Sequence, residues 1–335
     1  MTAPYDARPQ LMRIATGHIL TAALYCVAEL GVVDEMPTGE PFSVDELAAR
    51  VGADADALHR VMRALAAEGL FVETAPHAYA TTELGELLRD GPGTMRYFAL
   101  LHGSQSMPQF VDMLETVRTG VPVPIRRDGR TRWEQLADDP EQAEVFNRAM
   151  RGRAERLHLA LQAVDWSDAR TVVDVGAGMG GVLLPHLMRE PHLCGVLFDL
   201  PFAEADARGA IADTGLADRC DFVGGDFFQA VPGGGDIYLL SNVLHDWADD
   251  EAHRILSTTR AAMGEDARLW LLVLEDVVAP GDDRQPVKIL DLQMLVALGG
   301  RERTEHEFRS LFEAAGFELV EKAGTGPHAL IGRPV

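Results

Sequence analysis

One histidine and two glutamates in the C-terminal half of the chain have the chemistry to take a proton from a bound molecule. His245 follows an apolar stretch, Glu275 follows a second one, and Glu302 lies in a glycine-rich loop. A lone histidine in such a place is more often structural. A carboxylate on one ring nitrogen, however, fixes the neutral tautomer and stabilises the imidazolium that forms. The three residues therefore predict a general base with flanking carboxylates, suited to a phenol-like hydroxyl with a pKa of about 10.

A series of short apolar stretches upstream of His245 ends in glycines and acids. The residues at these ends are Asp174, Gly176, Gly178, Asp199, Asp226 and Phe227. Glycines in such a turn let the backbone bend tightly and approach a ligand closely. Carboxylates at this spacing suit a ligand that presents hydroxyls and amines rather than phosphates.

S-adenosylmethionine fits these residues better than a dinucleotide does. Asp174 suits the cationic amino group of a methionine tail, and Asp199 suits two ribose hydroxyls. Asp226 offers an acceptor to the adenine amino group, and Phe227 offers an apolar wall to its ring. A dinucleotide fold also places an acid on ribose, so Asp199 alone does not discriminate between the two cofactors. Any single acid here could also be a solvated residue at the end of a strand, with no ligand. The adenine contacts, and the lack of a second nucleotide-binding half, favour S-adenosylmethionine.

The elements that must position these residues are short strands alternating with helices from Thr171 onward. This alternation predicts a parallel sheet with helices on both faces, and ligands bind such sheets at the carboxyl ends of the strands. We expect His245 at the end of a strand over 237–244 and Glu275 at the end of the next strand. A helix over 305–315 and two β-rich pieces complete the chain, and the domain boundary falls near 164–169.

The N-terminal part of the chain is predicted to be mainly helical. Apolar residues at helical spacing indicate a helix over 11–36, either a subunit interface or a core helix. Ser43 and Glu46 form a capping-box pattern, and Asp54 is placed to cap a second helix. A hairpin over 71–81 then completes a winged-helix pattern.

The winged-helix pattern leaves two roles open, reading DNA in a regulator or acting as a scaffold for dimerisation. Its second helix carries as many acids as basic residues, which favours the scaffold role. Residues 95–165 continue as helices, with a Pro-, Gly- and Arg-rich break from Gly120 to Arg132.

Composition excludes several classes of protein. The 335-residue chain has a formal net charge of −22, with no basic footprint for nucleic acid. Its three cysteines match no redox or metal spacing, and no apolar run reaches the ~20 residues that span a bilayer. A protein located in the cytoplasm, without nucleic acid or membrane partners, is the expectation.

Several motifs together make the chain resemble the metal-independent small-molecule O-methyltransferases of the plant caffeate/flavonoid type and their bacterial natural-product relatives. The motifs are VDVGAGMGG, FDLP, GDFF, LHDW, LED and GGRERTEHEF. The resemblance implies an α/β fold, with a Rossmann-like methyltransferase domain and a mainly helical N-terminal winged-helix dimerisation domain. It divides the chain into a dimerisation domain (1–94), a helical linker and substrate-lid region (95–165) and a catalytic domain (166–335).

The same resemblance implies the site residues and partners. S-adenosyl-L-methionine is the expected cofactor, S-adenosyl-L-homocysteine its product, and a homodimer formed through the N-terminal helices the expected assembly. Beyond the residues above, the family pattern adds cofactor contacts at Leu200 and Ser241, and acceptor contacts at Trp133, Phe146, Met150, Asp246 and Met294. Ser241 departs from the pattern, since plant members usually have lysine there. We expect no metal, because acid pairs such as Asp249-Asp250 indicate solvated helix caps or loops.

Methyl transfer to a phenolic or enolic hydroxyl of an aromatic natural product is the leading functional hypothesis. An enzyme on the same scaffold with other chemistry is the first alternative: N-methylation, hydroxylation, decarboxylation or a pericyclic step. A ligand-sensing winged-helix regulator is the second. The presence of His245, Glu275 and Glu302 favours O-methylation.

Overall fold

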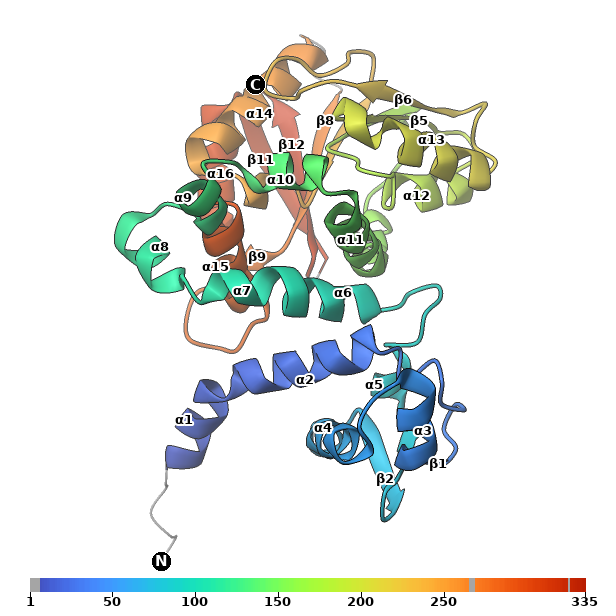
Figure 1. Cartoon of the computed structure of the whole chain (residues 1–335). Coiled ribbons are helices and arrows are strands. Elements are labelled where there is room, and N and C mark those ends of the chain that lie inside the picture. The colour runs from blue at the N-terminus through green and yellow to red at the C-terminus, as the bar shows by residue number, and fades with distance from the viewer. Residues whose placement is uncertain (1–6, 265–268, 325) are drawn as a thin grey trace, which may run out of the picture. The chain divides into compact units, whose positions relative to one another are not determined.

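The computed structural model describes residues 7–264, 269–324 and 326–335, and these residues form two compact units (Figure 1). The first unit contains residues 7–111 and 140–153. The second contains 112–139 and the described residues from 154 onward. The long helix α11 (Pro140–Leu161) runs from one unit into the other. The division of the chain into three domains stays a prediction.

The first unit consists of helices and one small sheet. Its helices are α1 (Arg8–Ala15), α2 (Gly17–Glu29), α3 (Val44–Val51), α4 (Ala55–Ala67), α5 (Glu83–Glu86), α6 (Arg96–Leu100), a π-helix (Leu101–Ser106), α7 (Met107–Phe110) and the start of α11. The sheet has the order β1-β3-β2, with β1 (Phe42–Ser43) and β2 (Phe71–Ala75) both antiparallel to β3 (Ala78–Thr81). Helices α3 and α4 followed by this hairpin confirm the winged-helix pattern.

Local signals explain most of this unit. The Asp54 side chain accepts a hydrogen bond from Ala57 N at 2.9 Å, which confirms the predicted cap of α4. The capping box predicted at Ser43 is wrong, because Ser43 precedes α3 without a capping hydrogen bond from its side chain. The helix predicted over 11–36 is two helices, α1 and α2, with an angle of 45° between them. Among the described residues, no single helix is long and apolar enough to cross a membrane, although α1 and α2 together meet that test by length and composition.

The second unit is built on a seven-stranded sheet with the order β11-β12-β8-β7-β4-β5-β6. Its strands are β4 (Thr171–Val175), β5 (Cys194–Asp199), β6 (Cys220–Gly224), β7 (Ile237–Ser241), β8 (Trp270–Glu275), β11 (Phe317–Ala323) and β12 (His328–Pro334). The strands β4 to β8 are parallel, as the alternation of strands and helices predicts. Strand β12 runs antiparallel to β8 and β11, so the sheet is mixed rather than purely parallel.

Helices cover both faces of this sheet, since the two sides of each central strand belong to different apolar clusters (Figure 1). On one face, Val172 and Leu239 share a cluster with residues of α12 (Leu183–Arg189) and α13 (Glu204–Asp213). On the other, Val173 and Leu240 share a cluster with residues of α14 (Asp249–Met263) and α16 (Glu305–Ala314). Burial on both faces is why these strands are continuous apolar runs.

The remaining elements of the second unit lie between or beyond these strands. They are α8 (Met113–Thr119), α9 (Val123–Asp128), α10 (Arg132–Asp138), α15 (Val287–Ala297), a 3₁₀ helix (Pro201–Ala203), a second 3₁₀ helix (Leu244–Asp246) and the parallel pair β9 (Val277–Val278) with β10 (Arg303–Thr304). Helix α9 lies inside the segment from Gly120 to Arg132, which we predicted to be a break. Pro122 and Gly129 lie at the two ends of α9, so these residues delimit a short helix here.

Two of the predicted strand ends are displaced. Strand β6 ends at Gly224, so Asp226 and Phe227 lie in the loop after it. Strand β7 ends at Ser241 and not at Leu244, because Asn242 has a positive φ of 52° that breaks the extended backbone. His245 therefore lies on the 3₁₀ helix Leu244–Asp246, called the His245 turn below.

Candidate active site

The glycine-rich turn after β4 needs glycine for two separate reasons. Gly176, Gly178 and Gly180 all have positive φ, at 76°, 54° and 75°, where other residues are strained. A Cβ on Gly176 would also lie 2.7 Å from Cγ2 of Val243. A Cβ on Gly178 would meet nothing within 4 Å, so the open side of the turn is at this residue.

Asp199, at the end of β5, is bound by the main chain of this turn. Its Oδ2 accepts a hydrogen bond from Gly178 N at 2.6 Å, and its Oδ1 accepts one from Leu200 N at 2.7 Å. Burial raises the pKa of Asp199, while the two main-chain hydrogen bonds oppose that shift. Each carboxylate oxygen has a second lone pair, so Asp199 can still accept from two ligand hydroxyls. Leu200, the other predicted contact at this end, supplies one of the two donors.

The loop after β6 combines a fixed carboxylate with an aromatic wall. Asp226 accepts hydrogen bonds from Phe228 N at 2.8 Å and from Nε2 of Gln229 at 3.0 Å. The Phe227 ring meets Phe228 and Trp247 edge to face, with centroids 4.9 and 5.8 Å apart. A polar acceptor beside an apolar wall is what an adenine ring requires.

Two buried polar atoms near these strand ends have no hydrogen-bond partner among the described residues. They are Oδ1 of Asp174, on β4, and Oγ of Ser241, at the end of the neighbouring strand β7. Burial, and then the charge of Asp199, raise the pKa of Asp174 to about 8. Leaving such atoms unpaired is costly, so this arrangement suits a ligand that brings a cation and a hydrogen-bond donor. The residues present therefore fit the amino-acid part of S-adenosylmethionine, and Ser241 still offers a hydroxyl where lysine is usual.

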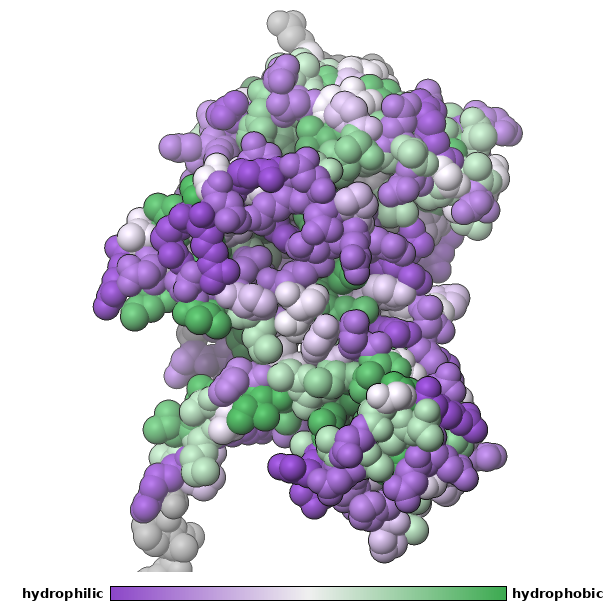
Figure 2. Space-filling view, viewed as in Figure 1, coloured by the Kyte–Doolittle hydropathy of each residue, from purple (hydrophilic) through white to green (hydrophobic). Residues whose placement is uncertain are grey.

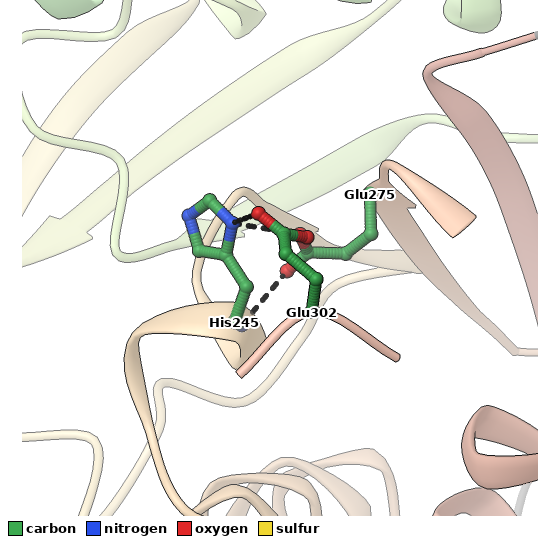
Figure 3. A group of neighbouring side chains, drawn as sticks. All are labelled: His245, Glu275 and Glu302. Atoms are coloured by element: carbon green, nitrogen blue, oxygen red, sulfur yellow. Dashed lines mark hydrogen bonds and ion pairs between the residues drawn. The ribbon is translucent and has the colours of Figure 1, made fainter. Parts of the chain in front are cut away.

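The structure brings His245, Glu275 and Glu302 together (Figure 3). Nδ1 of His245 lies 3.0 Å from Oε1 of Glu302 and 3.5 Å from Oε2 of Glu275. The main-chain N–H of His245 donates to Oε1 of Glu275 at 3.2 Å. All three side chains are buried, and Nε2 points away from both glutamates (Figure 3). Asp246 lies on that other side, with its Oδ1 3.4 Å from Nε2.

The charges around the imidazole control its protonation. Burial by itself lowers the pKa of His245, but the carboxylates of Glu275, Asp246 and Glu302 outweigh it and hold this pKa well above its usual range. Burial also raises the pKa of Glu275, against the effect of the neighbouring imidazolium. The surrounding carboxylates therefore favour the protonated form of the ring. It must lose that proton before it can act as a base.

Some predicted acceptor contacts lie near this cluster, and others belong to the first unit. The Trp133 ring, on α10, stacks beside Trp247 with centroids 6.5 Å apart. Met294 is buried on α15. Phe146 and Met150 are half-buried on the part of α11 that belongs to the first unit. Their contact with an acceptor stays a prediction.

Sequence reasoning missed the residues that hold the His245 turn. Arg303 is fully buried and binds main-chain carbonyls of the turn, together with the carboxylate of Asp249. Asp249 is exposed in the first turn of α14, as predicted, and it also pairs with Arg303. Asp291 accepts a hydrogen bond from Glu302 N at 2.7 Å. The only available signal was an arginine directly after a candidate catalytic glutamate.

Two family models match the chain. The O-methyltransferase domain matches residues 110–318, and the O-methyltransferase dimerisation domain matches residues 12–90.

Curated relatives match over nearly the whole chain. The phenazine O-methyltransferase PhzM of Lysobacter antibioticus is 40% identical over 97% of this chain and 96% of its own. The aclacinomycin 10-hydroxylase RdmB of Streptomyces purpurascens is 37% identical over 98% of this chain and 89% of its own.

Solved structures match equally broadly. LaPhzM has a TM-score of 0.92 at 39% identity, covering 99% of this chain and 100% of that one. The O-methyltransferase NcsB1 from neocarzinostatin biosynthesis, solved with S-adenosylmethionine and 2-hydroxy-5-methyl naphthoic acid, has a TM-score of 0.80 at 33% identity, covering 94% and 95%.

These matches confirm the predicted family, fold class and cofactor. One ligand atom from each of His245, Glu275 and Glu302 lies within 4.8 Å of the others, a spacing that would also admit a metal ion, but this family works without one. The chain belongs to the S-adenosylmethionine-dependent O-methyltransferase family.

Proposed function

We propose that this protein transfers the methyl group of S-adenosylmethionine to a phenolic or enolic hydroxyl of an aromatic natural product, with His245 as general base. The observation that carries the proposal is the 3.0 Å contact between His245 Nδ1 and Glu302. The Glu302 carboxylate lies closer to Nδ1 than Asp246 lies to Nε2, which favours the tautomer whose Nε2 lone pair can accept a proton. Bound S-adenosylmethionine would supply an electrophilic methyl group on a sulfonium.

The raised pKa of His245 is compatible with the role of general base if a bound cation lowers it. A positive charge close to the imidazolium disfavours it and lowers the pKa of His245, against the three carboxylates that raise it. Asp174 and Ser241 offer places for the cationic end of the cofactor. A ring brought to its neutral form in this way can accept the proton of the acceptor, and the same carboxylates stabilise the imidazolium that proton transfer forms.

The proposed cofactor contacts are Asp174, Gly176, Gly178, Asp199, Leu200, Asp226, Phe227 and Ser241. Positioning the acceptor oxygen in line with the methyl contributes more than the base does, since orientation supplies up to ~7–11 kcal/mol of a barrier. Trp133, Phe146, Met150, Asp246 and Met294 are the residues we propose for positioning the acceptor.

The test uses His245→Ala with two aromatic probes. The first is 2-hydroxy-5-methyl naphthoic acid, which is bound in the NcsB1 structure, and the second is 3-amino-4-hydroxybenzoate, which is named in the description of another relative. We expect the wild type to form S-adenosylhomocysteine and an O-methyl product with at least one probe. We expect His245→Ala to lower kcat by about 10²–10⁴-fold while calorimetry shows unchanged S-adenosylmethionine binding. His253→Ala, a change of a half-buried histidine on α14 whose ring contacts Ala314 O, is the matched control. A His245→Ala rate near that of the wild type would show that His245 is not the base.

Another chemistry on the same scaffold is the second candidate, because a 37% identical relative is described as a hydroxylase. The discriminating measurement is the product itself. Mass spectrometry of the same reactions shows a gain of one methyl group for transfer and a gain of one oxygen for hydroxylation. Methyl transfer to nitrogen is separated from transfer to oxygen with the amino-bearing probe, by locating the new methyl.

We also propose that the protein is a cytoplasmic homodimer. Large apolar side chains are exposed along α1 and α2, where Figure 2 shows hydrophobic surface: Leu11, Met12, Ile14 and Ile19. Such a patch favours a partner surface. The three free cysteines suit a reducing compartment. Light scattering should give twice the 36.5 kDa chain mass for the wild type. The double variant Leu11→Lys/Ile14→Lys should be monomeric, and Val335→Lys, at another exposed apolar residue, should stay dimeric.

A further inference from the structure

We propose that Arg303 is a positioning residue for the methyl-transfer step, because its guanidinium fixes the His245 turn against Glu302. The proposal rests on the proposed function, in which His245 accepts the proton. Arg303 touches none of the reacting groups. It acts through the main chain that carries His245.

The His245 turn cannot hold its own shape. A single 3₁₀ turn has little internal stabilisation, because few hydrogen bonds repay the ordering of its residues. Its hydrogen bonds here are long, 3.2 Å from Asp246 N to Val243 O and 3.3 Å from Trp247 N to Leu244 O. The side-chain position of His245 therefore depends on contacts from outside the turn.

Arg303 supplies these contacts on both sides of His245. Its Nη1 donates to Leu244 O at 2.7 Å, and its Nη2 donates to Trp247 O at 2.9 Å. Those two carbonyls bracket His245 in the sequence. One rigid planar group thus fixes the first residue of the turn and the residue that follows it.

The guanidinium uses its full set of donors. Nε and Nη2 both donate to Oδ1 of Asp249, at 3.0 and 2.9 Å, and Nη1 also donates to Arg301 O at 3.4 Å. With the two turn carbonyls, these make five hydrogen bonds for the five N–H groups of an arginine. A fully buried guanidinium with every N–H paired loses hydrogen bonds if it moves, which holds it in this position.

The main chain before Arg303 is joined to the same turn. Arg301 N donates to His245 O at 2.8 Å, and a Cβ on Gly300 would lie only 2.1 Å from that oxygen. Glu302 lies between Arg301 and Arg303 in the chain, and its main-chain N–H donates to Asp291 at 2.7 Å. Arg303 therefore fixes the turn to the chain segment that also carries the carboxylate partner of His245. This explains how the 3.0 Å contact of His245 with Glu302 is maintained.

The experiment compares Arg303→Lys with Arg260→Lys in the full-length enzyme. Arg260, on α14, also donates to main-chain carbonyls, those of Gly264, Gly316 and Val335, none of which belongs to the His245 turn. A lysine keeps the charge but donates from one nitrogen, so it cannot span Leu244 O and Trp247 O. We expect Arg303→Lys to lower kcat about 10²-fold, the size of effect that an error of about 1 Å in position produces. The S-adenosylmethionine dissociation constant should stay within about threefold.

Asp249→Asn gives a graded second variant. It leaves both carbonyl contacts of Arg303 in place, so we expect less than a tenfold loss of kcat. Arg303→Met is the severe variant. If it fails to fold, Arg303→Lys and Asp249→Asn still decide the question.

Imidazole nitrogen NMR of His245 provides a readout that loss of stability alone would not move. We expect Arg303→Lys to shift the His245 ring signals and the pH midpoint of kcat, and Arg260→Lys to change neither. Unchanged His245 signals and an unchanged kcat in Arg303→Lys would overturn the proposal. So would a loss of activity that is fully explained by a smaller fraction of folded enzyme. If the wild type methylates no probe, the proposed function fails, yet the NMR comparison still shows whether Arg303 sets the position of the ring.

Discussion

Two parts of the candidate site lie on the same sheet and are built in different ways. The predicted nucleoside site uses consecutive strand ends, with Asp199 held by neighbouring main-chain N–H groups. The proton-accepting cluster takes one residue each from a one-turn helix, a strand end and a loop. Its contacts join residues 30 and 57 positions apart.

The difference teaches which function depends on topology and which on particular side chains. The carboxyl ends of parallel strands gather wherever the doubly wound sheet forms, so the nucleoside site follows from the fold itself. The cluster needs, in addition, contacts that fix one turn against one loop. We therefore expect changes in the cluster to affect turnover, and changes in the glycine-rich turn to affect cofactor binding.

Glu302→Gln should give the largest effect on kcat, because it disrupts the proton-accepting cluster and leaves the nucleoside site intact. The new amide can donate to Nδ1 of His245, which favours the tautomer with its proton on Nε2. That ring cannot accept the acceptor's proton, so we expect kcat to fall about 10³-fold while cofactor affinity stays within about threefold. Steady-state kinetics and calorimetry measure the two quantities.

Glu305→Gln, a change of a half-buried glutamate on α16 that pairs with Lys322, is its control and should leave both quantities unchanged. A parallel loss of cofactor affinity in Glu302→Gln would show that the two parts of the site are not separable.

Gly176→Ala should affect the predicted nucleoside site. The substitution meets a positive φ, which costs roughly 1–2 kcal/mol, and a close contact with Val243. We expect the S-adenosylmethionine dissociation constant to rise about 10²-fold by calorimetry. Gly209→Ala, in α13 where an added Cβ meets nothing within 4 Å, is the control and should bind like the wild type. Because Val243 precedes the His245 turn, a fall in kcat at saturating cofactor would reveal coupling between the two parts.

Much of the fold and of the candidate site was predictable from local sequence. Apolar runs located the strands, and glycines located the turn after β4, because both signals act over a few residues. The end of β7 was missed because the positive φ of Asn242 has no apolar signature. The contacts of Arg303 were missed because their acceptors are main-chain carbonyls more than 50 positions away, and any residue type supplies a carbonyl.

Asp174→Asn tests the linkage between cofactor binding and stability. Burial raises the pKa of Asp174 to about 8, so folding favours its protonated form. Its contribution to stability is therefore fully present below the unfolded-state pKa of about 4 and is lost as pH rises to about 8. We expect Asp174→Asn to raise the free energy of unfolding at pH 8.5 by roughly 2–4 kcal/mol without cofactor, with little effect at pH 4.

Urea denaturation at the two pH values measures this difference. The exposed Asp213→Asn control should stay within about 0.5 kcal/mol of the wild type at both. The stabilised Asp174→Asn variant should bind S-adenosylmethionine about tenfold more weakly, since the neutral amide no longer attracts an ammonium. Equal stability of Asp174→Asn and wild type at pH 8.5 would contradict the buried-acid explanation.

Removing metal ions should give the smallest effect, although the cluster has the spacing for a cation. A metal bound by Nδ1 of His245 would need the position that the Glu302 carboxylate already occupies at 3.0 Å, and it would remove the contact that orients the base. We therefore expect millimolar EDTA to leave kcat/KM within about twofold, and added Zn²⁺ to inhibit the wild type more than Glu302→Gln. Activity that is lost in EDTA and restored by Mg²⁺ or Mn²⁺ would instead make the cluster a metal site. The two parts of the site would then differ in their ligand and not only in how they are built.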